Sequence, residues 1–421
     1  MTAATSIPLD RTSSPSLLAD YNRVRGASES ICAPLETEDY VIQTMEDMSP
    51  PKWHLAHTTW FFETFLLKPN LSGYEEFHPR FNYLFNSYYE AVGKRHPRPK
   101  RGMLSRPTVK EVYEYRAHVD GAMAELVGKV DGIETLIRLG LNHEQQHQEL
   151  LFTDCKHMLA QNPLRPAYQT RQTASTAAEA PLGWVDFPGG ITELGYSGAE
   201  FHFDNEGPRH EVLLRSYRLA DRLVTNGEFI EFMEDGGYQT ASHWLSMGWA
   251  IAQEQGWEAP YCWEKVDGRW HSFTLDGLLP VEAADPVCHV SYFEADAFAS
   301  WAGKSLPTEG EWEVAASAQP VEGNFYGSGR LRPAPAAGGG PVRQIYGDVW
   351  EWTASPYSAY PGYSAAKGAV GEYNGKFMCN QYVLRGGSAV TSKDHIRPTY
   401  RNFFPPEARW QFSGIRLADR S

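Results

Sequence analysis

Two histidines one helical turn apart are the clearest candidates for chemistry in this sequence. Residues 142–150 read Asn-His-Glu-Gln-Gln-His-Gln-Glu-Leu, which places His143 and His147 at positions i and i+4. On a helix, both imidazoles project from one face and can bind the same metal ion. Leu139 and Leu150 lie on or beside that face, so we expect the pair to point into a core. The alternative is two solvated histidines, whereas a buried pair without a ligand would be costly.

A third ligand for such a metal should come from a helix that faces the pair. The segment 53–60 contains two candidates, His54 and His57. His57 shares a helical face with Phe61, which makes it the predicted ligand, while His54 could contact a ligand or cap the helix. Three neutral imidazoles leave coordination positions open for substrate and oxygen, as an iron(II) oxygenase requires. These ligands alone do not discriminate iron from zinc.

The histidine pair also matches the HExxH motif of zinc proteases, so a zinc hydrolase is an alternative. One class of these enzymes needs Gly at position 150 and His or Asp at position 153, where this chain has Leu150 and Thr153. A second class needs a glutamate on a further helix downstream. The predicted helix ends near residue 160 and runs into a linker, so the sequence gives the zinc-hydrolase interpretation little support.

The elements that would carry these residues are helices. Apolar residues recur at helical spacing from about residue 14 to residue 161. On the predicted helix of the histidine pair, Glu149 and Asp154 are candidates for contacts with the ligands, with solvated carboxylates as the alternative. Four main helices and one long connection, 70–106, predict a four-helix bundle, and a connection of that length is usually functional. The helical stretches are 17–24, 38–48, 53–67, 108–127 and 133–159.

The second half of the chain has a different pattern. Residues 162–182 are polar, rich in Ala and Thr and bounded by prolines, which predicts a linker. From residue 183 to residue 421 the sequence has short strand-like runs, many glycines and most of the 13 tryptophans, which can anchor a loop-rich domain. A length of 421 residues also favours two domains. The sequence therefore predicts an α+β protein of two domains.

Composition excludes several classes of function. The net charge of -14 disfavours a nucleic-acid partner, because neutralising phosphates requires a basic face. No apolar run approaches the roughly 20 residues that span a bilayer, and no signal peptide is visible at the N-terminus. Five cysteines without a CxxC pair make a disulfide framework an unlikely basis for the fold. We therefore expect a cytoplasmic protein without a membrane or nucleic-acid partner.

The motifs of both halves resemble known domains. The helical half, with Leu-Ala-His57 followed by His143-x-x-x-His147-x-Glu149, resembles a DinB-like domain. The second half resembles the formylglycine-generating-enzyme fold, also called the sulfatase-modifying-factor fold, which is C-type-lectin-like. Its marks in chain order are Asp204-Asn205-Glu206-x-Pro208-x-His210, Val224-Thr225-Asn226-x-Glu228-Phe229, Gly236-Gly237-Tyr238, Pro286-Val287-x-x-Val290-Ser291, Trp301-Ala302-Gly303-x-x-Leu306-Pro307-Thr308-Glu309, Gly347-Asp348-Val349-Trp350-Glu351-Trp352-Thr353, Arg385-Gly386-Gly387-Ser388 and Phe412-Ser413-Gly414-Ile415-Arg416.

Together the two halves resemble the EgtB family, the sulfoxide synthases of ergothioneine biosynthesis. This resemblance implies an enzyme that uses iron(II) and O2 to join a thiol sulfur to C2 of the imidazole of hercynine (Nα-trimethylhistidine). It also implies that the sulfur is oxidised to a sulfoxide. The residues that match the iron ligands of the family are His57, His143 and His147.

The resemblance further assigns residues to the substrates. Gln146 matches a position that contacts the trimethylated substrate. Asn402, Phe403 and Phe404 match an Asn-Trp-Asp stretch of the members that use γ-glutamylcysteine, where the aspartate binds the glutamyl amine. Because Phe404 stands in place of that aspartate, the resemblance implies the branch that uses free L-cysteine and gives hercynylcysteine sulfoxide.

The long connection of the bundle supplies the remaining candidates. Tyr88 and Tyr89 resemble paired tyrosines that supply protons near the iron in the cysteine-using branch, with simple packing as the alternative. Arg98 and Arg101 align with arginines that bind the thiol substrate, and an arginine fork suits a carboxylate. Arg95 precedes them, and any one of the three could be a surface charge.

Other assignments of the same scaffold stay open. A γ-glutamylcysteine-using enzyme, a selenosugar-using enzyme of the selenoneine type and an ovothiol-type synthase share the metal-binding half. A formylglycine-generating enzyme is a copper protein with a cysteine pair, whereas Cys379 has no near partner in the sequence. A non-catalytic binding module is a further alternative, against which the intact candidate ligands argue.

Overall fold

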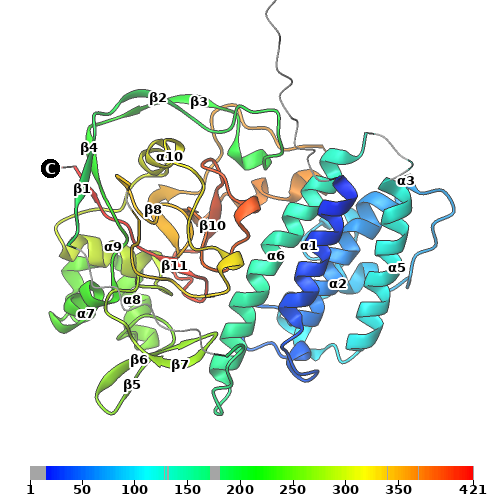
Figure 1. Ribbon diagram of the computed structural model, residues 1–421, viewed down its shortest axis with the longest axis horizontal. Coiled ribbons are helices and arrows are strands. Elements are labelled where there is room, and N and C mark those ends of the chain that lie inside the picture. The colour runs from blue at the N-terminus through cyan, green and yellow to red at the C-terminus, as the bar shows by residue number, and fades with distance from the viewer. Residues whose placement is uncertain are drawn as a thin grey trace, which may run out of the picture.

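A computed structural model describes residues 16–127, 129, 132–170, 181–338, 340–367 and 369–420. It has two parts, a helical bundle and a mixed domain of short strands and helices, as Figure 1 shows. The predicted α+β class with two domains is confirmed. The four main bundle helices are α1 (Leu17–Cys32), α2 (Pro51–Phe62), α5 (Val109–Val127) and α6 (Glu134–Gln161).

Helix α2 is the centre of the bundle. All twelve of its residues are buried, and it packs against both α5 and α6. Pro51 occupies its first turn, where a proline costs no hydrogen bond. The helix continues through a π-helical turn, Glu63–Leu67, into the short α3 (Lys68–Asn70). The connection to α5 contains α4 (Phe81–Phe85) and two 3-10 turns, Glu90–Val92 and Arg98–Met103.

One predicted helix is wrong. The stretch 38–48 forms only a 3-10 turn, Asp39–Val41, followed by irregular backbone. Side chains in this segment bond to backbone and to other elements instead. Gln43 Nε2 donates to the carbonyls of Met48 and Arg98, at 2.9 and 3.0 Å. Such tertiary contacts override a periodicity that is helical in the sequence alone.

The second domain is built on small sheets. One has the order β1-β4-β12, a second has the order β10-β9-β8-β11, a hairpin pairs β2 with β3, and a third sheet has the order β5-β6-β7. The strands are β1 (Trp184–Phe187), β2 (Gly190–Leu194), β3 (His210–Leu214), β4 (Tyr217–Ala220), β5 (Trp263–Val266), β6 (Arg269–Thr274), β7 (Gly277–Pro280), β8 (Trp350–Pro356), β9 (Tyr382–Arg385), β10 (Asn402–Phe404), β11 (Ser413–Gly414) and β12 (Ala418–Asp419).

Four helices flank these sheets, α7 (Asn226–Glu234), α8 (Ser246–Gln255), α9 (Tyr292–Trp301) and α10 (Glu309–Ser317). Three of them begin with a capping box, in which Thr225, Ser291 and Thr308 each accept from the backbone of a glutamate three residues later. Because capping fixes where each helix starts, these motifs have a structural role in the fold.

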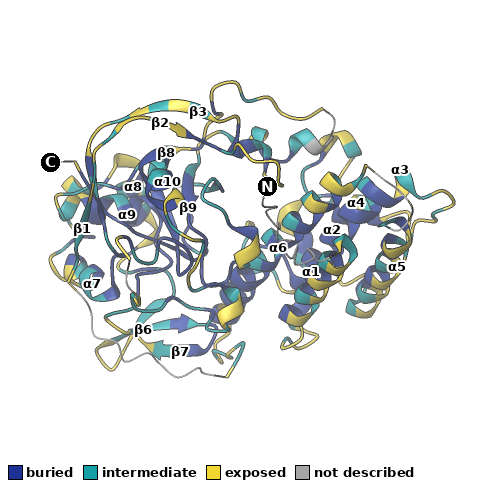
Figure 2. Cartoon of the chain, turned by 45° about the horizontal axis from the view of Figure 1, so that its top comes forward, coloured by how far each residue is buried: buried dark blue, intermediate teal, exposed yellow. Residues whose placement is uncertain are grey.

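Buried ion pairs explain other sequence motifs of this domain. Arg416 Nε donates to Glu351 Oε2 at 2.8 Å, and both side chains are fully buried. Arg385 Nη2 donates to Glu309 and Glu313, each at 3.0 Å. Burial is concentrated inside both domains, while β2 and β3 carry many exposed residues (Figure 2). The charged residues of these motifs therefore pair with one another inside the domain.

Helix α6 lies on the side of the bundle that faces the second domain (Figure 1). Gln145 Nε2 donates to Asp394 at 2.8 Å, and Thr391 Oγ1 donates to Glu149 at 2.6 Å. Glu149 also accepts from the indole of Trp350, and burial raises the pKa of its carboxyl to about 7. The candidate Glu149 thus contacts the second domain and is not one of the clustered metal-ligand candidates.

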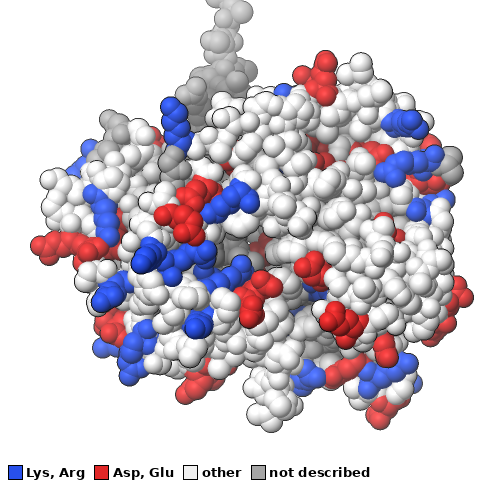
Figure 3. All heavy atoms as spheres, turned by 180° about the vertical axis from the view of Figure 1, so that it is seen from behind, with Lys and Arg blue, Asp and Glu red and all other residues white. Residues whose placement is uncertain are grey.

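The linker predicted at 162–182 includes residues 171–180, which lie outside the described residues. Its described beginning packs on both domains, because the backbone N–H of Tyr168 donates to Leu275 and its hydroxyl donates to Ile31. The face opposite to Figure 1 is hollowed near its middle, with Lys and Arg gathered on the bundle side (Figure 3). Among the described helices, none has the length and apolar composition needed to cross a bilayer.

Candidate metal centre

The structure brings the three predicted histidines together. His57 comes from α2, and His143 and His147 come from α6; their candidate ligand atoms all lie within 4.8 Å of one another. His57 Nε2 lies 3.2 Å from His143 Nε2. Two nitrogens that are each about 2.1 Å from one ion lie about 3 Å apart when they are neighbours in its coordination sphere. The spacing therefore suits a shared metal.

The orientation of His57 is fixed on both faces of its ring. Its Nδ1 lies 2.6 Å from the carbonyl oxygen of Phe85, so Nδ1 carries the proton and Nε2 keeps its lone pair. Trp53 stacks on the ring at 4.5 Å and Trp60 at 5.5 Å, with both measured between centroids. A metal at Nε2 would meet a ligand that needs no reorientation.

His54 and Asp154, which the sequence left as open candidates, both lie beside the centre. His54 Nδ1 lies 2.7 Å from His147 Nδ1, and His54 Nε2 lies 2.9 Å from Asp154 Oδ2. Both residues are buried. His54 therefore contacts a candidate ligand and does not cap the helix.

Burial keeps the three imidazoles neutral. It lowers the pKa of His143 to about 3 and the pKa values of His57 and His147 well below the ordinary value. The neighbouring histidines lower these pKa values further. Neutral imidazoles are the form that binds metals, so the three side chains are in the protonation state that a metal requires at neutral pH.

The donor set fits iron(II). Among the described residues, the cluster of potential ligands consists of the three imidazoles alone, which leaves coordination positions for substrate and O2. His143 Nδ1 is buried without a hydrogen-bond partner in the described part of the chain. Three neutral nitrogen ligands would also accept zinc, so the donor set by itself does not select the metal.

Glu144, the acid of the HExxH motif, has a structural role. Its carboxylate accepts from Arg25 Nη1 at 2.8 Å, from Arg116 Nη2 at 3.1 Å and from Ser28 Oγ at 2.7 Å. Burial alone would raise the pKa of Glu144, but the two guanidiniums outweigh it and lower this pKa. A hydrolase would need this carboxylate free as a general base, so the geometry disfavours the zinc-hydrolase alternative.

Three tyrosines lie near the histidines. The stacked Tyr88 and Tyr89 have hydroxyl oxygens 3.5 Å apart, and Tyr89 contacts Trp60, with ring centroids 5.6 Å apart. Tyr373, which the sequence analysis missed, has its ring centroid 5.6 Å from that of His143. Burial raises the pKa of all three phenols, so they keep their protons at neutral pH.

Gln146 joins helix α6 to two tyrosines of the second domain, Tyr373 and Tyr400. Its Oε1 accepts from the hydroxyl of Tyr373, and its Nε2 donates to Tyr400 at 2.8 Å. The predicted substrate contact therefore lies beside the His143 ring. Gln146 directly precedes His147 on α6, and its two hydrogen bonds fix the orientation of its amide.

The three predicted residues of β10 face two ways. Phe403 stacks on Tyr357, with ring centroids 4.0 Å apart, and lies 5.9 Å from Phe377, whose ring is 5.3 Å from Tyr88. Phe404 packs against Trp410 at 6.0 Å, and Asn402 Oδ1 accepts from the Phe403 backbone. Of the three residues, Phe403 is therefore the one that is linked to Tyr88, through the ring of Phe377.

The arginines of the connection differ in their surroundings. Arg101 is buried, lies 3.4 Å above the ring of Trp53 and donates to Ser49 at 2.8 Å and to Ser87 at 3.1 Å. In the described residues no carboxylate pairs with it. Arg98 is exposed and donates to the carbonyl of Asp47, and Arg95 pairs with the exposed Glu90. Arg101 is the best placed of the three to bind a carboxylate near the histidines.

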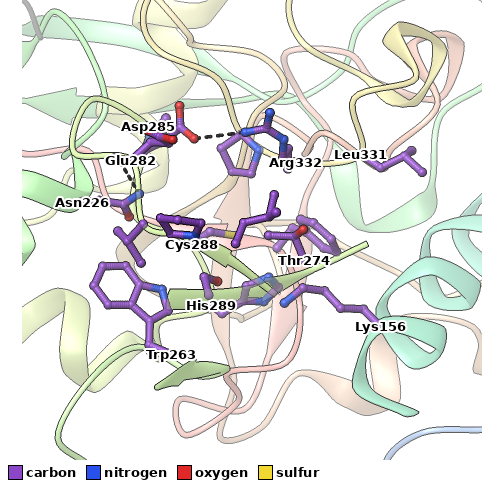
Figure 4. Close-up of a pocket in the computed structure, with 17 residues that line it drawn as sticks. Lys156, Asn226, Trp263, Thr274, Glu282, Asp285, Cys288, His289, Leu331 and Arg332 are labelled. Atoms are coloured by element: carbon purple, nitrogen blue, oxygen red, sulfur yellow. Dashed lines mark hydrogen bonds and ion pairs between the residues drawn. The ribbon is translucent and has the colours of Figure 1, made fainter. Parts of the chain in front are cut away.

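A separate cavity of about 60 Å³ lies farther along α6. Lys156 and His289 line it from the two domains (Figure 4). Asp285 and Arg332 form an ion pair in its wall, at 3.4 Å. None of the three clustered histidines lines this cavity, so it is distinct from the metal centre.

Comparisons with known proteins agree with this architecture. Residues 20–151 match the DinB superfamily, and residues 170–339 and 335–421 match the sulfatase-modifying factor enzyme 1-like domain. Hercynine oxygenase of Mycobacterium tuberculosis is 32% identical over 396 residues, which cover 88% of this chain and 91% of that protein. The chain belongs to the hercynine oxygenase family. The predicted resemblance is thereby confirmed, and the chain is an oxygenase-type oxidoreductase.

Two further proteins are similar to this chain. Hercynine oxygenase of Mycolicibacterium smegmatis is 33% identical over 405 residues, with 88% of this chain and 91% of that protein covered. Ergothioneine biosynthesis protein 1 of Schizosaccharomyces pombe is 27% identical over 237 residues, covering 52% of this chain and 27% of that longer protein. The smegmatis protein, which is covered over most of its length, supports the same family assignment.

Proposed function

We propose that the chain uses iron(II) and O2 to join the sulfur of L-cysteine to C2 of the imidazole of hercynine, giving hercynylcysteine sulfoxide. One C–H bond of hercynine and the S–H bond of cysteine are broken, and a C–S bond and an S–O bond are formed. One oxygen atom of O2 enters the sulfoxide and the other leaves as water, so atoms and electrons balance. The observation that carries the proposal is the three-histidine cluster in a chain of this family.

His57, His143 and His147 would hold the iron through neutral imidazole nitrogens. When bound, iron(II) supplies a site at which O2 can be activated next to the substrates. The stacking of His57 between Trp53 and Trp60 would hold this ligand in place. Three protein ligands leave room for both a thiolate and oxygen.

Arg101 would bind the carboxylate of cysteine. Its guanidinium is buried and has only hydroxyl acceptors among the described residues, so a substrate carboxylate would supply the missing counter-charge. Arg101 lies on the face of Trp53, and the same ring stacks on His57, so a carboxylate bound by Arg101 would lie near the three histidines.

Gln146 and the tyrosines would serve the other substrate and the protons. The amide of Gln146 lies between the aromatic side chains of Tyr373 and Tyr400. Aromatic rings can bind the trimethylammonium group of hercynine through cation–π contacts. Tyr88 and Tyr89 keep their phenolic protons and can donate them to oxygen, as an oxidation of sulfur requires.

The choice of cysteine rests on Phe404. This residue stands where γ-glutamylcysteine-using members carry an aspartate, and it packs on Trp410 as an apolar side chain. An apolar phenyl ring offers no charge for a glutamyl amine. In contrast to γ-glutamylcysteine, free cysteine lacks the glutamyl group that this aspartate would bind.

An oxygen-electrode experiment with a choice of donors tests the proposal. The purified chain is loaded with iron(II) under argon, and O2 uptake is recorded with hercynine, with each donor alone and with hercynine plus cysteine, γ-glutamylcysteine or a selenosugar. We expect rapid uptake only with hercynine and cysteine together. Faster uptake with γ-glutamylcysteine or the selenosugar would overturn the donor assignment, and no hercynine-dependent uptake with any donor would overturn the proposed function.

A further inference from the structure

Three side chains form one hydrogen-bonded line beside the candidate metal centre: the buried Asp154 and His54 and the half-buried His147. We propose that His54 and Asp154 are positioning residues that fix the tautomer of His147 and strengthen it as a metal ligand. This inference rests on the proposed function only for the presence of a metal at the three histidines. It adds two residues to which the sequence assigned no definite role.

The protons of this line can be placed from the contacts alone. Asp154 Oδ2 already accepts from the backbone N–H of Ser49 at 2.8 Å, so its carboxylate faces His54 as an acceptor. His54 Nε2, at 2.9 Å, must therefore be the donor to Asp154. In the neutral form of His54 the other nitrogen is an acceptor, so His54 Nδ1 accepts a hydrogen bond from the N–H of His147 Nδ1 across 2.7 Å.

This order of donors leaves a single outcome for His147. Its Nδ1 carries the proton, so its Nε2 keeps the lone pair that a metal needs. The carboxylate at the far end polarises both N–H groups in the same direction. A ligand whose second N–H points to an acceptor backed by a negative charge is a stronger electron donor to its metal.

The fold makes the line from two adjacent helices. His147 and Asp154 are seven residues apart on α6, which puts them on one face two turns apart. His54 enters between them from α2, three residues before His57 on the same helix. Relative exposures of 2% for His54 and 3% for Asp154 exclude a water-filled alternative for these partners.

The three ligands are consequently unequal. His57 donates to a neutral backbone carbonyl at 2.6 Å, and His143 Nδ1 has no partner among the described residues. His147 alone is backed by a carboxylate through a second imidazole. Loss of such supporting partners typically weakens metal binding about 10- to 100-fold.

Cobalt(II) is a suitable probe, because its visible absorption reports the ligands independently of turnover. The full chain, freed of metal, is titrated with Co(II) at neutral pH as wild type and as His54→Phe, His54→Gln and Asp154→Asn. His157→Phe is the matched control, since His157 is a buried histidine of α6 that contacts Thr44 and Tyr261 rather than a ligand.

We expect His54→Phe to weaken Co(II) binding about 10- to 100-fold. His54→Gln should recover most of the affinity, because its amide oxygen can accept from His147. Asp154→Asn should keep the geometry, weaken binding by a smaller factor and shift the visible bands. His157→Phe should match wild type in both readouts.

Each outcome decides between the two claims. Wild-type affinity and bands in both His54→Phe and Asp154→Asn would overturn the relay. An equal loss in His54→Gln and His54→Phe would also overturn it, because a mere packing role predicts no rescue. A wild-type chain that binds Co(II) and shows the relay effect, yet forms no product from hercynine and any thiol, would instead overturn the proposed function.

Discussion

Glu144 Oε2 accepts a hydrogen bond from Arg25 Nη1 at 2.8 Å, and both side chains are buried between α1 and α6. Arg116 of α5 pairs with the other carboxylate oxygen at 3.1 Å. The acid that looks like a hydrolytic base in the sequence therefore ties three helices together. Its place in the helix between the two metal-ligand candidates means that the same residues that form the centre also hold the bundle around it.

Replacement of this carboxylate should cost stability. Glu144→Gln leaves two guanidiniums partly uncompensated in the core, and we expect the free energy of unfolding to fall by about 3 kcal/mol. Chemical denaturation followed by circular dichroism measures the change. The control is Glu125→Gln, which removes a solvent-exposed pair with Lys129 and should have no measurable effect. Equal stabilities for Glu144→Gln and wild type would show that this network does not hold the bundle.

Removal of the buried guanidinium should act on the thiol substrate. Arg101→Gln deletes the proposed partner of the cysteine carboxylate, so kcat/KM for cysteine should fall by about 10- to 100-fold while hercynine binding changes little. Arg95→Gln removes an exposed arginine of the same segment and serves as the control. Steady-state kinetics with each substrate varied in turn separates the two. A loss confined to hercynine would contradict the assignment of Arg101.

Loss of the paired phenols should slow chemistry without loss of metal. In the Tyr88→Phe, Tyr89→Phe double variant we expect turnover to fall by about 10²- to 10⁴-fold, because the two phenols proposed as proton donors are removed. Bound iron should stay at the wild-type level. Tyr83→Phe, at a partly exposed position on the same segment, is the control. Normal turnover in the double variant would mean that the pair only packs, and would direct attention to Tyr373.

The stability of the metal-free chain should depend on pH through buried histidines outside the centre. Burial, reinforced by the positive charge of Lys156, lowers the pKa of His289 well below its ordinary value. Below about pH 6.5 this histidine is protonated in the unfolded chain but stays neutral in the folded chain. The free energy of unfolding therefore falls by about 1.4 kcal/mol for each unit by which the pH is lowered. The stabilisation is thus present above about pH 6.5 and is lost as the pH falls.

A single variant isolates this effect. In His289→Asn the titrating group is absent, and asparagine tolerates the positive φ of 66° at this position. Urea unfolding of both proteins between about pH 4.5 and 6 should give a slope against pH that is about 1.4 kcal/mol per unit smaller in the variant. Parallel slopes would show that His289 is protonated in the folded state.

Much of the fold follows from local patterns that the structure retains. The i, i+4 spacing of His143 and His147 on a long apolar-faced stretch predicted one face of α6, and the stretches 53–67 and 108–127 became α2 with its π-helical extension and α5. The stretch 38–48 failed because Gln43 and Thr44 bond to other parts of the chain, which no local periodicity encodes.

The three clustered histidines could be predicted because the spacing of residues on one helix face, or a motif, identifies each of them. Tyr373 was missed because it lies in an irregular segment that reaches His143 only after the two domains have packed together. His54 was named but left open, since spacing gives the side of a helix and not which ring nitrogen meets which partner. Contacts that cross the domain boundary need the folded chain.

The most direct test of the central claim is the mass of the product formed under 18O2. The iron-loaded chain is supplied with hercynine and cysteine, and the product is analysed by mass spectrometry beside a reaction of His143→Ala. We predict hercynylcysteine sulfoxide with one 18O atom from the wild type and none of this product from the variant. An unlabelled product, or the same yield from His143→Ala, would contradict oxygen chemistry at the three histidines.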